Sequence, residues 1–444
     1  MITDLTKDQP NKIIWRFALP MIISIIFQQM YNISDSVIAG KCISENALAA
    51  VGASFPVTML FMQVANGANA GCAVIISQFF GAKNNLKMKA AVSTSMISST
   101  VLAVILTVLG IVLCKPILLM LKTPDNIFKD SAVYLNIYFA GLLFVMLYNI
   151  CNGIFTALGD SKTPLYFLIA SSVGNVILNL VFVLVFDMGV AGLAWATFIA
   201  QGIAAVFSAV TLYKRLSKIK ITHKFPLYSN KMLKKISFVA VPSILQNSFV
   251  SVGGILIQGI INDFGSSTIA GFAAATKLNI FAVNCIGVIS NATASFSAQN
   301  IGAGKYERVP QGYRAGLAME VFCIIPFMFL FFWFPNFMVN LFMDEKSSTA
   351  VTVGAEFLRW SCPFYVMLSI KLISDGVLRS AGAMRAFMST TFLDLFIRVA
   401  LSYILAPVIG FTGVCISWPA GWIVSSILSY FYYKKGFWKR QSLS

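Results

Sequence analysis

The residues best suited to chemistry in this chain share one face of its first long apolar segment. Gln28, Asn32 and Asp35 are spaced at positions 0, 4 and 7, with Tyr31 beside them, and this spacing places them on one side of a helix. A carboxyl group inside an apolar segment is costly and is by default a functional candidate. Burial opposes its charge whereas hydrogen bonds support it. Such a group can therefore take up and release a proton.

Amides and a hydroxyl in later apolar segments can complete a site around Asp35. Asn175 and Asn179 are four residues apart, so they share a helix face, and Asn152 and Thr197 lie in the two neighbouring segments. The predicted ion site consists of Asp35, Gln28, Asn152, Asn175, Asn179 and Thr197. Because its ligands are oxygen atoms, it could hold either H⁺ or a hard cation such as Na⁺ at Asp35.

A plainer interpretation of the same residues stays open. Asp35 could lie at the outer end of its helix as an interfacial residue, and the amides could simply join helices. Pro20, earlier in the same segment, removes a backbone hydrogen bond and can bend the helix.

The composition predicts an all-α integral membrane protein. Hydrophobic residues make up 58% of the 444 positions and charged residues 11%, with a mean hydropathy of +0.81, whereas soluble chains carry about 25% charge. Apolar stretches of about 20 residues indicate membrane-spanning helices, and they lack the alternation typical of strands. The twelve predicted spans are 14–38, 55–80, 91–113, 131–155, 164–186, 190–213, 236–261, 273–298, 312–334, 357–379, 387–408 and 413–433.

The two halves of the chain repeat one another. Gln78-x-x-Gly81-Ala82 recurs 221 positions later as Gln299-x-x-Gly302-Ala303, and Pro20 matches Pro242 at an offset of 222. Six spans in each half mean that both halves enter the membrane from the same side, so the two six-helix bundles form a parallel pseudo-two-fold repeat, a common plan for transporters. We predict bundles at 1–213 and 236–444, joined by a linker at 214–235.

The distribution of basic residues predicts how the chain is oriented in the membrane and argues against nucleic acid as a partner. The net charge of +17 is concentrated in alternate loops, so the positive-inside rule places both termini in the cytoplasm. Basic residues that follow loops, and not a single face, argue against nucleic-acid binding.

The sequence lacks the residue patterns of metal sites, disulfide frameworks and nucleotide-binding loops. The eight cysteines are scattered singly, the chain has one histidine, and it has no G-x-x-x-x-G-K-[ST] phosphate loop. We therefore expect no enzyme activity and no cofactor apart from a coupling ion.

The second half does not copy the acid site. The position matching Asp35 is Leu256 or Ile257. Asp394 and Arg398 are spaced to pair within one helix, as are Lys371 and Asp375, and Glu320 has no obvious local partner. The predicted candidates for a substrate cavity are Tyr31, Asn32, Glu320, Lys371 and Asp375.

Four motifs together resemble the multidrug and toxic compound extrusion (MATE) transporters. They are the run 28–40, Gln78-x-x-Gly81-Ala82, the run 157–164, and Gly174-Asn175-x-x-Leu178-Asn179 followed by Gly189-x-x-Gly192. The resemblance implies two six-helix lobes around a V-shaped cavity. It also implies export of amphipathic, often cationic drugs in exchange for H⁺ or Na⁺, with Asp35 as the ion-coupling acid, partnered by Gln28, Asn152, Asn175 and Thr197.

The chain departs from the family pattern at two places. Many relatives have a second acid where this chain has Asn179, and the NorM branch has acids near the positions of Val250 and Leu368 or Ser369. The chain therefore resembles the DinF-like and Gram-positive efflux members more than NorM, and its single acid favours H⁺.

The resemblance also implies a monomer in a bacterial plasma membrane that contacts small drug-like substrates and lipids. The alternative is a flippase for a lipid-linked substrate, whose phosphates would need cations such as Lys277, Lys371 and Arg398.

Overall fold

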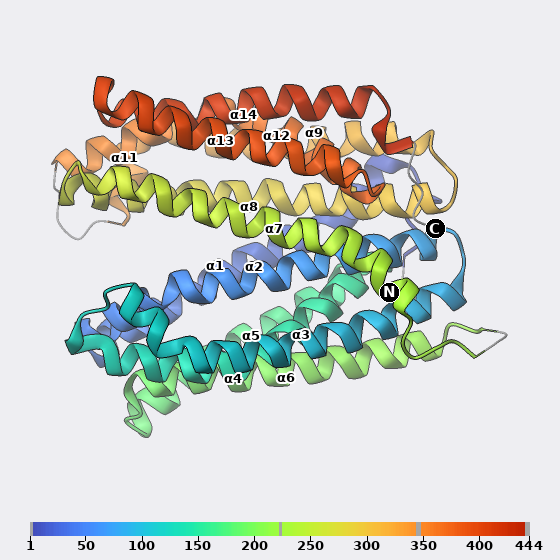
Figure 1. Ribbon diagram of the computed structural model, residues 1–444, viewed down its shortest axis with the longest axis horizontal. Coiled ribbons are helices and arrows are strands. Elements are labelled where there is room, and N and C mark those ends of the chain that lie inside the picture. The colour runs from blue at the N-terminus through green and yellow to red at the C-terminus, as the bar shows by residue number, and fades with distance from the viewer. Residues whose placement is uncertain (1–2, 222–223, 343–347, 440–444) are drawn as a thin grey trace. The chain divides into compact units, whose positions relative to one another are not determined.

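The computed structural model describes residues 3–221, 224–342 and 348–439, and in this part of the chain all regular structure is helical. The first half holds α1 (Pro10–Ile38), α2 (Glu45–Gly81), α3 (Asn85–Met120), α4 (Asp125–Ala157), α5 (Lys162–Leu180) and α6 (Gly189–Ser217) (Figure 1). The second holds α7 (Asn230–Asn262), α8 (Ser266–Gly302), α9 (Arg308–Trp333), α10 (Pro335–Asn340), α11 (Ser348–Ser361), α12 (Tyr365–Ser380), α13 (Met384–Ile409) and α14 (Phe411–Lys434). Twelve described helices are long and apolar enough to cross a membrane, which confirms the predicted fold class.

The tenth span begins earlier than its apolar residues suggest. It is predicted at 357–379, but it runs over 349–380 as α11 and α12, joined by a 3₁₀ turn at Cys362–Phe364. The first turns carry polar residues such as Thr352 and Glu356, which hide the span from a hydropathy count, while Phe357 is fully buried. Pro363 has no N–H to donate, which accounts for the change of helix type at this point.

The chain forms two compact units whose boundaries differ from those of the two halves. The first unit holds the chain up to Asp4 and Leu19–Ile244, and the second holds Leu5–Ala18 and everything from Leu245 onward. The first turns of α1 therefore pack in the second unit, where the Trp15 ring lies 5.5 Å from that of Phe322. Local hydropathy carries no information about this exchange, and the boundaries 1–213 and 236–444 stay a prediction.

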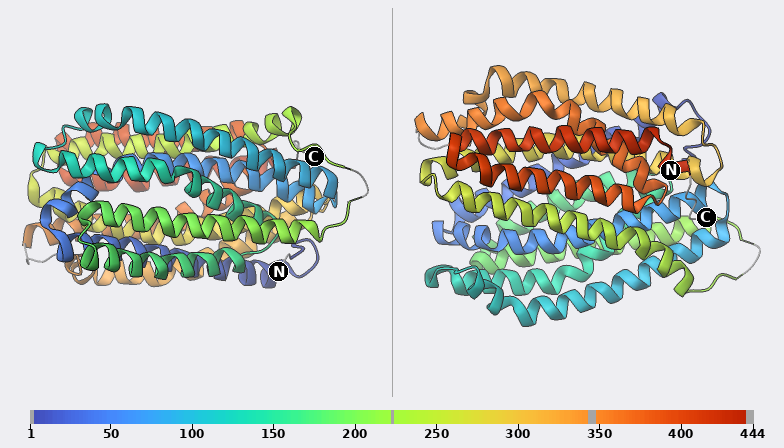
Figure 2. Two further views of the ribbon diagram at one scale, coloured as in Figure 1. Left: turned by 90° about the horizontal axis from the view of Figure 1, so that it is seen from below. Right: turned by 45° about the horizontal axis from the view of Figure 1, so that its top comes forward.

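Each unit is built around helices that pack along much of their length (Figure 2). In the first unit α4 packs against α2, α3 and α6, and in the second α14 packs against α12 and α13. Since neighbouring helices lie together along their length, side chains from several helices can meet inside one unit.

The connection between α6 and α7 is shorter than the predicted linker at 214–235. α6 continues to Ser217, with Lys214 and Arg215 in its last turn, where cations interact favourably with the helix dipole. The remaining connection is held against α3, because Lys89 Nζ donates to the Ile219 carbonyl at 2.7 Å and Ser93 Oγ donates to the Leu227 carbonyl at 2.6 Å. Residues 222–223 of this linker lie outside the described residues.

The motif at 157–164 forms the turn between α4 and α5. Gly159 has a φ of +75°, a conformation that favours glycine. Asp160 follows and accepts hydrogen bonds from the Thr163 backbone N–H at 3.2 Å and from its hydroxyl at 2.9 Å, and it also pairs with Arg215. The motif therefore caps α5 and ties it to the end of α6.

Glycine on α2 allows close contact with α7. A Cβ atom added at Gly71 would lie 2.5–2.6 Å from the backbone and Cβ of Ala240, whereas one added at Gly52 on the same helix would have nothing within 4 Å.

We predict that Gly71→Ala lowers the thermal stability of the purified protein, because Ala240 must shift to admit the methyl group. Gly52→Ala is the matched control and should be neutral or stabilising, since alanine favours a helix over glycine by about 1 kcal/mol. Thermal unfolding in detergent measures both. Equal melting temperatures for the two variants would contradict the close packing.

Candidate functional site

The ends of α1 and α5 bring the main polar residues together. Asp35 lies one turn before the end of α1, and Asn179 lies at the end of α5. Each helix continues as a π-helical turn, over Ala39–Ile43 and Val181–Val185, and the two turns pack through a buried cluster that includes Ala39 and Val183. Such turns are rare and occur frequently at functional sites.

The central contact joins Asn179 to Asp35. The amide Nδ2 of Asn179 donates to Oδ1 of Asp35 at 2.6 Å, and a hydrogen bond to a carboxylate is stronger than one between neutral groups. Asn179 is fully buried, and its own Oδ1 has no hydrogen-bond partner among the described residues. The contact therefore leaves a buried acceptor free next to the acid.

Asn175 and Thr197 extend this contact to α6. In one orientation the Asn175 amide accepts from Asn179 at 2.8 Å and donates to Thr197 Oγ1 at 3.3 Å. In the opposite orientation its nitrogen donates to Asp35 Oδ1 at 3.1 Å, and its oxygen accepts from the Thr197 backbone N–H at 3.2 Å. In both orientations Asn175 joins the end of α5 to Thr197 on α6.

Tyr31 belongs to the same cluster. Its hydroxyl lies 3.2 Å from Thr197 Oγ1 and beside the Asp35 carboxyl, and Tyr134 of α4 also faces Asp35. We refer to Tyr31, Asp35, Asn175, Asn179 and Thr197 as the Asp35 cluster.

Three other predicted residues on α1 and α4 stand outside the described contacts of the Asp35 cluster. Neither Gln28 nor Asn152 has a described hydrogen bond to it, and Asn32 is exposed, with its amide 3.4 Å from Gln29 Oε1.

Pro20 lies inside α1, fifteen positions before Asp35 and next to the point where the chain passes between units. The Ser24 hydroxyl donates to the Pro20 carbonyl at 2.9 Å. Such a bond back to the preceding turn often bends a helix, so two features favour bending here.

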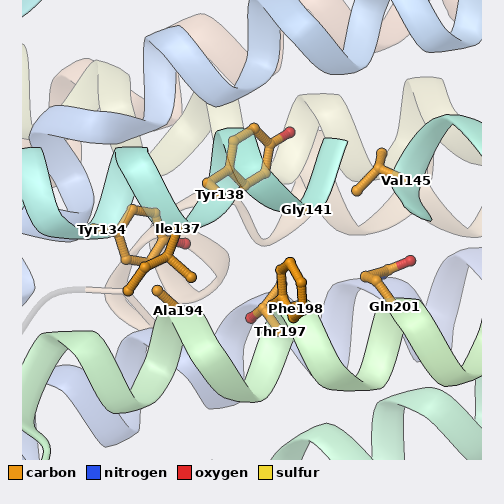
Figure 3. A pocket seen from close by; sticks show the side chains of 9 residues that line it. All are labelled: Tyr134, Ile137, Tyr138, Gly141, Val145, Ala194, Thr197, Phe198 and Gln201. Carbon is orange, nitrogen blue, oxygen red and sulfur yellow. The ribbon is translucent and has the colours of Figure 1, made fainter. Parts of the chain in front are cut away.

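A narrow hollow with about 10 Å³ of free space lies between α4 and α6 and shares Thr197 with the Asp35 cluster (Figure 3). Aromatic rings, aliphatic groups and the side chains of Thr197 and Gln201 surround it. The lining residues are Tyr134, Ile137, Tyr138, Gly141, Val145, Ala194, Thr197, Phe198 and Gln201. The sequence analysis missed Tyr134, Tyr138 and Gln201. The spacing of Tyr134, Tyr138, Gly141 and Val145 along one face of α4 could have indicated the two tyrosines.

Two pairs of charged residues lie within helices of the second unit. Lys371 Nζ lies 3.0 Å from Asp375 Oδ2, and Arg398 lies 2.7 Å from Asp394, so both predicted pairs are confirmed. Thr390 and Ser429 also donate to Asp375, at 2.9 and 2.6 Å. Lys371, Asp375 and Glu320 are all buried in this unit, and their role in a substrate cavity stays a prediction.

Twelve described helices that are long and apolar enough to span a membrane, with a polar cluster around one acid in the first unit, are typical of a polytopic membrane transporter. The MatE family model matches residues 20–181 and again 242–404, so it covers both halves. The chain therefore belongs to the MATE family of multidrug efflux transporters, as the motifs predicted, and it is a transporter and not an enzyme.

Similar proteins agree with this assignment. The chain is 27% identical over 441 residues to the "Probable multidrug resistance protein YpnP" of Bacillus subtilis, covering 99% of this chain and 98% of that protein. It is 22% identical to the "Multidrug export protein MepA" of Staphylococcus aureus, covering 92% and 90%. A solved "outward-facing conformation of a multidrug resistance MATE family transporter of the MOP superfamily" has a TM-score of 0.93 at 22% identity, covering 99% and 98%. These relatives fit the predicted Gram-positive side of the family and a multi-pass cell-membrane protein.

The amide at position 179 generates a prediction about ion selectivity. Asn179→Asp would place a second carboxylate beside Asp35 among the oxygens of Asn175 and Thr197, which suits a hard cation. We predict that Na⁺ then raises the melting temperature of the variant and leaves that of the wild type unchanged. At a hundred times its Kd, the ion would add about 2.7 kcal/mol.

Asn66→Asp, on the exposed face of α2, is the control for the added charge, and Na⁺ should not affect it. Equal stabilisation of the wild type by Na⁺ would contradict the prediction.

Proposed function

We propose that this chain is a cation-coupled antiporter that exports amphipathic, often cationic drugs, with Asp35 as the coupling acid. One observation carries the proposal: the hydrogen bond from Asn179 to Asp35, connected through Thr197 to an aromatic hollow between α4 and α6. The names of the similar proteins, which refer to multidrug resistance and export, support the substrate class.

The amides around Asp35 favour H⁺ over Na⁺. An amide can serve both states of a carboxyl group, because its N–H donates to the ionised form and its C=O accepts from the protonated form. The free Oδ1 of Asn179 is such an acceptor. A single carboxylate also gives Na⁺ less charge than the two-acid sites of many relatives.

The proposed cycle links the charge of Asp35 to the shape of α1. Drug leaves the outward-open state as Asp35 takes up a proton, and the neutral carboxyl no longer requires the donors that hold it to α5. The helix then bends near Pro20, and the transporter proceeds to its inward-open state. Each net charge that crosses contributes about 2.3 kcal/mol per 100 mV of membrane potential.

The proposal extends to the orientation, the oligomeric state and the cofactor of the chain. The basic residues of alternate loops support two cytoplasmic termini, and we propose that the chain works as a monomer among lipids, with the coupling ion as its only cofactor.

A flippase for a lipid-linked substrate is less well supported. It would need free cations for phosphate groups, yet Lys371 is paired with Asp375 and Arg398 with Asp394. Two of the three cations that motivated this alternative are therefore neutralised.

Ethidium efflux from membrane vesicles tests the proposal, with a pH gradient and a Na⁺ gradient imposed separately. We predict that the pH gradient drives efflux by the wild type and that Asp35→Asn reduces it to the background rate, because the coupling acid is gone. Asp187→Asn is the matched control: Asp187 is exposed, follows α5, and has a φ of +49° that asparagine tolerates. Normal efflux by a correctly inserted Asp35→Asn protein would sink the proposal.

A further inference from the structure

Glu320 differs from the other acids in the described spans of the second unit. Asp375 receives bonds from Lys371, Thr390 and Ser429, Asp394 receives one from Arg398, and Glu356 receives one from Thr412 at 2.5 Å. Glu320 lies in the middle of α9 and is fully buried, and neither of its carboxyl oxygens has a hydrogen-bond partner among the described residues. Glu320 takes no part in the cycle proposed above.

In the described parts of α8, α9, α11 and α12, no cation faces the Glu320 carboxyl. The ionisable groups that face it, Tyr313 and Cys323, lie on α9 itself. On α12, Lys371 is bonded to Asp375, which in turn bonds to α13 and α14. On α8, Lys277 is exposed and Cys285 faces Cys323; on α11, Glu356 bonds to α14. An unpaired charge in such surroundings is prohibitively costly, so Glu320 is protonated in this conformation.

Hydroxyl groups lie beside Glu320 at the contact between α9 and α12. The Ser369 hydroxyl faces the carboxyl, yet neither group makes a hydrogen bond of ordinary geometry. Nearer the start of α9, the Tyr313 hydroxyl lies 3.1 Å from Ser374 Oγ. A buried carboxyl that served packing alone would have its O–H satisfied, as nearly all buried polar groups are. An unsatisfied acid next to an unsatisfied hydroxyl fits a group whose partner arrives in another conformation.

We propose that Glu320 is a second proton-binding site of the transporter, inside the second unit, which releases its proton along the hydroxyls between α9 and α12. Release breaks the O–H bond of the carboxyl, transfers the proton to water and leaves a carboxylate that Ser369 and water can solvate. The site is reprotonated when the unit returns to the described conformation. This inference rests on the proposed H⁺ antiport and adds a second proton to each cycle.

Infrared spectroscopy of the reconstituted protein tests whether Glu320 carries a proton. The carbonyl stretch of a protonated carboxyl at neutral pH should be present in the wild type, lost in Glu320→Gln, and retained in Asp35→Asn and in Glu307→Gln. Glu307 is an exposed acid just before α9, so it controls for the substitution. A wild type without this band would overturn the inference, and this readout does not depend on transport or on the folding of a variant.

Counting protons released on drug binding, in weakly buffered solution, tests whether the proton exchanges. We expect about two per drug for the wild type, one for Glu320→Gln, one for Asp35→Asn and none for the double variant. If Glu320→Gln releases as many protons as the wild type, Glu320 is a static buried acid and the inference fails. If Asp35→Asn instead matches the wild type, the proposed function fails.

Discussion

A carboxyl group inside a membrane must have donors, a cation or a proton, because no bulk water is there to solvate it. The structure shows acids with hydrogen-bond donors and acids with a basic partner, and it implies one acid that keeps its proton. Asp35 has amide donors from α5, Asp375 and Asp394 have basic partners one turn away on their own helices, and Glu320 has neither. In the proposals above, the partners of Asp35 and Glu320 change during the cycle, whereas a paired and hydrogen-bonded acid such as Asp375 stabilises its unit.

Irregular helical turns lie next to the contact between Asp35 and Asn179. The π-helical turns that follow α1 and α5 pack against each other next to the Asn179–Asp35 bond. Further along α1, Pro20 lies beside the point where the chain passes from one unit to the other, and Pro242 holds the matching place in α7. A change of charge at Asp35 is therefore connected, through one continuous helix, to a junction between units. In the proposed cycle, this continuity links ion uptake at Asp35 to a change of access.

The sequence predicted what depends on local spacing and average polarity. Twelve spans follow from hydropathy, and the pairing of Lys371 with Asp375 follows from i, i+4 spacing. The association of Asp35 with Asn175 and Asn179 follows from the cost of polar groups in lipid. Packing between distant segments was not predictable in this way. The hollow lined by Tyr138 and Gln201, the packing of Trp15 in the second unit and the early start of α11 all depend on which helices become neighbours.

The central claim is that Asp35 couples drug movement to proton movement, and coupling is reciprocal. The most direct measurement uses proteoliposomes loaded with ethidium and a trapped pH indicator, diluted into drug-free medium with no imposed ion gradient. The account predicts that ethidium leaving through the wild type draws protons inward and acidifies the lumen, and that Asp35→Asn abolishes this acidification. Ethidium efflux through the wild type without a change of lumenal pH, or equal acidification by Asp35→Asn, would contradict it.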